Sequence, residues 1–97
     1  MLPHGSNNTI TDVEGVKVGH LSIQSGGHGG TDASSGSIRT GVTVILPHEH
    51  NIYRNNVAAS AHVLNGFGKS VGLLQVIELG RIESPIALTS TLNTWKI

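Results

Sequence analysis

The stretch Gly41-Val-Thr-Val-Ile-Leu46 is the part of this 97-residue chain that indicates its fold most clearly. Its β-branched and apolar residues favour an extended strand within a core. Pro47 follows, and proline has no N–H for a sheet ladder and disfavours a helical backbone at the residue before it. The sequence therefore predicts a buried strand that ends at Leu46.

Two further strands are expected on either side of this stretch in the sequence. Residues Val16 to Ile23 alternate imperfectly between apolar and polar, and Pro85 to Thr91 are rich in β-branched residues, with proline at the first position, where its missing N–H matters least. Residues 24–37 hold repeated glycines, serines and threonines, whose backbone entropy opposes regular structure. A Gly/Ser-rich loop is expected there.

The segment between these strands is less regular. Val57 to Leu64 is a run of mostly small or apolar residues that fits a strand or a helix, and we favour the strand. A short helix is then expected, capped by Ser70 and followed by Gly80, although a period-two pattern also fits. Its apolar face consists of Leu73, Leu74 and Ile77. The whole chain is predicted to be α/β, with about four strands and one short helix.

The last residues have the pattern of a helix start. Thr91 or Asn93 could cap a helix that begins with residues 94–97, but four residues cannot sustain one. We therefore expect Trp95 and Ile97 to pack against sequence that lies outside this chain.

Composition narrows the classes of function. One Phe, one Tyr and one Trp beside 13 glycines supply few large side chains for a core. Six basic and six acidic residues cancel and do not cluster, so we expect no nucleic-acid partner. The absence of cysteine excludes disulfides and a cysteine nucleophile. No segment has the roughly eighteen apolar residues of a membrane span, so no membrane partner is expected, and the cytoplasm is the default location.

Three known functional motifs are incomplete, absent or better explained otherwise in this sequence. Gly68-Lys69-Ser70 resembles part of a phosphate-binding loop, but position 63 is valine where that motif needs glycine. His48-Glu49-His50, with His62, could bind a metal ion, yet a surface turn after the proline is favoured, and no metal or cofactor is expected. No Gly-x-Ser-x-Gly elbow is present, so conventional triad chemistry cannot be located in the sequence.

Three blocks together are similar to one known family. They are Ile10-Thr-Asp-Val-Glu-Gly-Val-Lys-Val-Gly-His20, Arg39-Thr-Gly-Val-Thr-Val-Ile-Leu-Pro47, and Ala61-His-Val-Leu-Asn-Gly-Phe-Gly-Lys-Ser-Val-Gly72 running into Pro85-Ile-Ala-Leu-Thr-Ser-Thr91. Their order and spacing resemble the start of the DmpA-type self-processing serine aminopeptidases, which include L-aminopeptidase/D-esterases and β-peptidyl aminopeptidases. The resemblance extends from about Ile10 to Asn93.

The resemblance implies that residues 1–97 are a single partial domain, the N-terminal part of a four-layer α/β/β/α sandwich. In this family a precursor cleaves itself between a glycine and a serine in its later part, and the new N-terminal serine is the nucleophile. The implied substrates are short peptides, amides or esters with a free N-terminus, and the implied assembly is a homo-oligomer.

The family's nucleophile and its tyrosine and asparagine oxyanion groups lie beyond the matched segment, so no catalytic residue is assigned to this chain. We expect Asn65 and Gly66 to fix a turn, and Thr89 and Thr91 to lie at a strand end facing the cleft. Turn chemistry and strand polarity alone are the favoured explanation of these four residues. Ser90 departs from the asparagine that relatives often have between the two threonines.

The expected function is therefore that of an aminopeptidase fragment that is inactive alone. The alternative is a small, non-catalytic interaction module derived from the same family.

Overall fold

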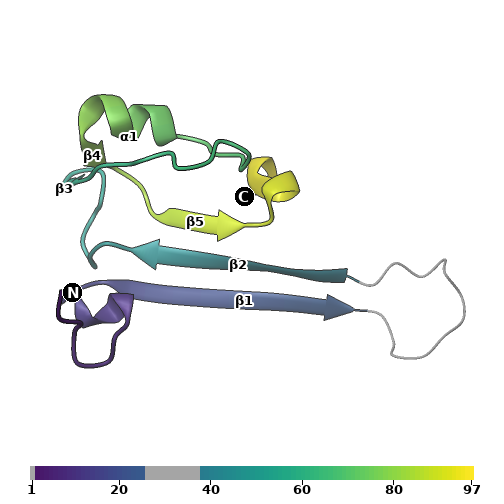
Figure 1. Cartoon of the computed structure of the whole chain (residues 1–97), viewed down its shortest axis with the longest axis horizontal. Coiled ribbons are helices and arrows are strands. Elements are labelled where there is room, and N and C mark those ends of the chain that lie inside the picture. Colours follow the sequence, from purple (N-terminus) through teal and green to yellow (C-terminus); the bar gives the residue numbers. More distant parts are fainter. Residues whose placement is uncertain (1, 26–37) are drawn as a thin grey trace, which may run out of the picture.

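A three-stranded antiparallel sheet is the main body of the structure. The computed structural model describes residues 2–25 and 38–97. Its central strand is β2 (Ile38–Leu46), which lies between β1 (Lys17–Ser25) and β5 (Ile86–Thr89), as Figure 1 shows. The whole of β1 pairs with β2, whereas β5 pairs only with Val42 to Ile45. The first part of β2, residues 38–41, is therefore paired only with β1.

All three predicted strands are confirmed, with shifted ends. The first strand runs on to Ser25, so Gln24 and Ser25 belong to β1 and not to the expected loop. The rest of that loop, residues 26–37, lies outside the described residues. The last strand is shorter than predicted, because the chain turns into a 3₁₀ helix after Ser90.

The prediction that the strand ending at Leu46 is buried is wrong. From Thr40 onward β2 is only half-buried, and no residue in the described ranges is fully buried. The pairing register shows which residues share a face of the sheet, and residues on both faces are exposed. Leu21 lies opposite Val42 on one face of the sheet and is 67% exposed, while Val18 on the other face is 41% exposed. Both faces of the sheet are open in the described part of the chain.

The dimensions of the molecule agree with an open sheet. The Cα radius of gyration is 17.4 Å, against roughly 12.5 Å expected for a compact domain of this length. The accessible surface is 8436 Å², against roughly 5,300 Å² expected for a folded protein of this mass. Hydrophobic burial therefore contributes much less to this fold than it does in a self-contained domain.

A second, two-stranded sheet joins β3 (Val57–Ala58) to β4 (Arg81–Ile82) in antiparallel register. The strand expected from Val57 to Leu64 is therefore wrong beyond Ala58. In this antiparallel register Ala58 lies opposite Arg81 and the Ala59 N–H donates to the Gly80 carbonyl at 2.9 Å, so later residues of the run would have to pair with α1, which offers no strand edge.

Helix α1 (Leu73–Leu79) lies between β3 and β4 in the sequence, and Figure 1 shows it beyond the β5 edge of the larger sheet. The predicted cap at Ser70 is wrong. Gly72 precedes the helix with a left-handed backbone, φ 78°, so the chain changes direction there and the helix starts later. The predicted end is confirmed, because Gly80 has φ 65° and donates its N–H to the Val76 carbonyl at 2.9 Å.

The predicted apolar face of α1 is partly wrong. Leu73 and Val76 are half-buried, whereas Leu74 is 82% exposed and Ile77 is also exposed. The helix packs one narrow stripe against β4, and Leu74 and Ile77 lie outside that stripe. None of the helices in the described ranges is long and apolar enough to cross a membrane.

Two 3₁₀ helices, η1 (Ile10–Asp12) and η2 (Thr91–Lys96), complete the elements. The helix start expected at residues 94–97 is thus replaced by η2, which follows Ser90 directly. A 3₁₀ helix is viable in such a short piece. The Trp95 indole N–H donates to the Leu92 carbonyl at 3.1 Å, so the exposed ring closes back on its own turn.

Asp12 organises the loop before β1. Its carboxylate accepts hydrogen bonds from the Asn7 side-chain amide at 2.8 Å, the Asn7 backbone N–H at 3.0 Å and the Thr9 backbone N–H at 3.3 Å. Desolvation raises the pKa of Asp12, but these hydrogen bonds together outweigh it and hold the pKa below its ordinary value.

We predict that acid loosens this loop. Since the folded pKa is depressed, the stabilisation is complete above the unfolded pKa near 3.8 and is lost as the pH falls through the folded value. The amide protons of Asn7 and Thr9 should shift together with Asp12 in an NMR titration from pH 6 to pH 2. Asp12→Asn should remove that transition, and an unchanged titration in this variant would contradict the assignment.

We also predict that Gly80→Ala weakens the end of α1. Alanine at a positive φ costs about 1 kcal/mol, so hydrogen exchange at the Gly80 position should accelerate about fivefold. Gly68→Ala is the matched control, because Gly68 has open space around it and no positive φ. Equal effects of the two substitutions would show that the left-handed backbone at Gly80 is not required.

Candidate functional site

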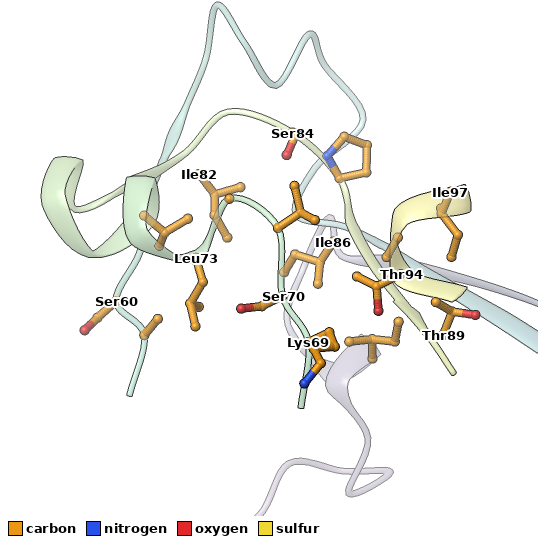
Figure 2. A pocket seen from close by; sticks show the side chains of 17 residues that line it. Ser60, Lys69, Ser70, Leu73, Ile82, Ser84, Ile86, Thr89, Thr94 and Ile97 are labelled. Atoms are coloured by element: carbon orange, nitrogen blue, oxygen red, sulfur yellow. The ribbon is translucent and has the colours of Figure 1, made fainter. Parts of the chain in front are cut away.

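A groove of about 660 Å³ lies beside β5 and is the candidate site. It is bounded by β5, the start of α1, η2 and the segments around residues 60–61 and 69–72, and Figure 2 shows its walls from close by. Seven large aliphatic side chains line these walls: Val71, Leu73, Val76, Ile82, Ile86, Leu88 and Ile97. A volume of this size is within the usual range for small-molecule and peptide sites.

The polar groups of the groove are one cation and several hydroxyls. Lys69 is the single ionisable side chain among the residues that line it. In Figure 2 Ser84 lies above the other labelled side chains and Lys69 below most of them, with Thr94 and Thr89 on the right of Lys69. The cation is about 5.8 Å from the centre of the Phe67 ring, which orients it weakly. The groove is therefore apolar along its walls and positive at one end.

Thr89 is the residue among the four expected scaffold positions that lines the groove. It is the last residue of β5, and its hydroxyl donates to the Gly41 carbonyl of β2 at 3.1 Å. That bond ties the end of β5 to the central strand and turns the hydroxyl away from the groove. Thr91 is the first residue of η2 and is not among the lining residues.

The turn expected at Asn65 and Gly66 lies just before the groove in the sequence. The Asn65 side-chain oxygen accepts the backbone N–H of Phe67 at 3.1 Å, which is the bond of an Asx turn. Gly66 and Phe67 form the turn itself, but neither Asn65 nor Gly66 lines the groove. Their position sets the path by which the chain reaches Lys69.

Of the residues considered as a metal site, His48 and Glu49 have other partners. His48 Nε2 is 2.7 Å from the Asn55 carbonyl, and Glu49 pairs with Lys17 at 2.6 Å. The hydrogen bond from Lys17 and its charge hold the pKa of Glu49 below the ordinary value. His62 is exposed, and no three potential ligands gather within the described ranges.

His20, Ser22 and Thr43 form a polar cluster on the larger sheet, and none of the three lines the groove. Its Nδ1 is 2.6 Å from the Thr43 hydroxyl and its Nε2 is 2.9 Å from the Ser22 hydroxyl. The His20 ring is hydrogen-bonded through both nitrogens although the residue is exposed. The cluster joins β1 to β2 and supports their register.

Sequence reasoning missed Lys69 and Thr94 as groove residues. The only sequence signal at Lys69 is the Gly68-Lys69-Ser70 pattern, which is an incomplete phosphate-binding motif. Lys69 lines a site only because η2 and β5 fold back beside it, and that proximity leaves no mark in the local sequence.

The comparisons with known proteins place the chain in the class of peptidases. Residues 8–97 match the model of Peptidase family S58. The chain belongs to Peptidase family S58, and the resemblance to the DmpA-type aminopeptidases is confirmed over this N-terminal portion.

Similar proteins include two β-peptidyl aminopeptidases named BapA. The protein from Sphingosinicella xenopeptidilytica is 45% identical over 89 residues, and that from Sphingosinicella microcystinivorans is 39% identical over 87 residues. These matches take in 92% and 90% of this chain and 22% of each relative. The chain thus spans about a fifth of the length of these curated relatives.

A solved structure agrees with the fold. The crystal structure of the PH0078 protein from Pyrococcus horikoshii OT3 matches with a TM-score of 0.83 and 54% sequence identity. The match takes in 96% of this chain and 26% of that one. The observed arrangement of few strands and one α-helix therefore occurs within a larger folded protein.

We predict that Thr89→Val destabilises the β5 side of the sheet. Valine keeps the shape of threonine but removes the hydrogen bond to Gly41, which should cost about 1 kcal/mol. Hydrogen exchange of the β5 amides measures this loss. Thr91→Val is the control, since no hydrogen bond of its hydroxyl is seen, and it should leave β5 unchanged; equal effects would show that the Thr89 bond is dispensable.

Proposed function

We propose that this chain provides the framework of a serine aminopeptidase that hydrolyses N-terminal residues from short peptides, amides or esters. Membership of Peptidase family S58 carries the proposal, and the names of the two BapA relatives support the aminopeptidase activity. In this proposal the nucleophile is a serine outside these 97 residues, exposed as a new N-terminus by self-cleavage. Its α-amine, with a pKa near 8, would accept the hydroxyl proton.

The contents of the groove support the inactivity of the chain alone. Its hydroxyls belong to Ser60, Ser70, Ser84, Thr89 and Thr94, and no histidine or carboxylate side chain lines it. A serine or threonine hydroxyl is a weak nucleophile without an adjacent base. The pair of His20 and Ser22 has a base, but it lies on an open strand of the sheet, where water is not excluded.

The proposal extends to the assembly and to the scaffold residues. The sheet would be one layer of a four-layer α/β/β/α sandwich in a cytoplasmic homo-oligomer. Asn65 and Gly66 would direct the loop that enters the groove, and Thr89 and Thr91 would fix the end of β5 and the start of η2 beside the reacting groups. The hydrogen bonds of Asn65 and Thr89 support these scaffold roles.

A non-catalytic interaction module is the second candidate, and the open apolar surface favours it. Leu64, Phe67 and Leu92 are each about four-fifths or more exposed, as contact residues for another protein would be. A monomeric chain that unfolds in one cooperative transition would favour this candidate, because a framework piece that needs a larger protein should aggregate or melt broadly.

We predict no turnover of aminoacyl p-nitroanilides by the 97-residue chain. Activity should be retained in a chimera in which this chain replaces the matching segment of BapA from Sphingosinicella xenopeptidilytica. BapA that lacks the segment is the control and should be inactive and unprocessed. Turnover by the isolated chain, abolished by a substitution within it, would refute the proposal that the nucleophile lies elsewhere.

A further inference from the structure

We propose that the groove beside β5 binds a short peptide in extended form and that Lys69 pairs with the C-terminal carboxylate of that peptide. This inference rests on the proposed function and names a substrate class for it, namely peptides of three or four residues with a free carboxylate. Lys69 is then a specificity-determining residue that discriminates such peptides from amides and esters.

The first observation is the outer edge of β5. In the described ranges β5 is the last strand of its sheet, and its pairing partner is β2 alone. In an antiparallel pair, alternate residues direct their N–H and C=O groups away from the partner strand, so the outer edge of β5 offers main-chain donors and acceptors. All four β5 residues line the groove. A peptide backbone is the ligand that matches such an edge.

The length of that edge limits the size of the peptide. Four strand residues span about 13 Å, which accommodates three or four residues of an extended peptide. The enclosing walls are aliphatic side chains from α1, β4 and β5, such as Leu73, Ile82 and Ile86. These surfaces suit alternate side chains of the peptide, which would point to one face of the sheet.

The second observation is the charge. Lys69 is the single ionisable side chain among the lining residues, and no carboxylate side chain accompanies it. A peptide ammonium group therefore meets no carboxylate side chain in the groove, whereas a peptide carboxylate meets the Lys69 ammonium. The Thr94 hydroxyl also lines the groove but already donates to the Thr91 carbonyl at 3.1 Å, so the recognition of the carboxylate rests on the Lys69 ammonium. The peptide N-terminus, where an aminopeptidase cleaves, then lies away from Lys69.

The experiment compares tetra-alanine with tetra-alanine amide in an NMR titration of the isotope-labelled 97-residue chain. The free acid should bind about fivefold more tightly than the amide, the upper range for an exposed ion pair, and high salt should remove the difference. Amide shifts should appear at Lys69 and along β5. An analogue N-methylated at each second nitrogen should bind more weakly, because it cannot complete the ladder.

Three variants separate the role of Lys69 from a general loss of charge. Lys69→Met should bind acid and amide equally, and Lys69→Arg should keep the preference for the acid. Lys96→Met is the matched control: Lys96 also lies over an aromatic ring, 4.9 Å from the Trp95 centre, but does not line the groove. It should bind as the unmodified chain does.

Two outcomes would overturn the inference. Equal binding of acid and amide by the unmodified chain would mean that the groove accepts an internal polypeptide segment and that Lys69 recognises no carboxylate. No binding of either peptide would show that the β5 edge is not a peptide site. Because binding requires no serine nucleophile, an active BapA chimera without peptide binding by the chain would leave the proposed function intact and refute only this inference.

Discussion

Main-chain hydrogen bonding along both edges of β2 is the constraint on which the rest of the structure depends. Because no described residue is fully buried, side-chain packing cannot hold the elements in place as it does in an ordinary domain. The ladder to β1 fixes the long hairpin, and the shorter ladder to β5 brings the C-terminal third of the chain against the sheet. The groove exists only because that second ladder places β5 beside the Lys69 loop.

The sequence predicted the features that local chemistry decides. β-Branched residues around Val42 and Val44 predicted the central strand, and Gly80 predicted the helix end, because each acts through its own backbone preference. The start of α1 and the length of the strand at Val57 were mispredicted, since they depend on which distant segment supplies a partner. For the site, Thr89 was anticipated as a strand-end residue, but Lys69 was missed because η2 and β5 reach it only in three dimensions.

Membership of the family offers an explanation for the two open faces of the sheet. The solved relative contains the same arrangement within a chain about four times longer, so equivalent strands occur there inside a larger protein. An accessible surface well above the value expected for this mass agrees with such a setting. On our proposal these faces carry layers that bring the serine nucleophile towards the β5 groove, and the framework and the chemistry come from different parts of one polypeptide.

The outer edge of β1 carries a further consequence for handling the protein. It is a nine-residue strand with no neighbour on that side in the described ranges, and Lys17 is its single lysine or arginine. Natural proteins usually guard such edges with several charges, a proline or a bulge, which discourage intermolecular sheet growth. At high concentration the chain should therefore self-associate through this edge into β-aggregates. Purification should accordingly keep the protein dilute and add stabilising additives from the first step.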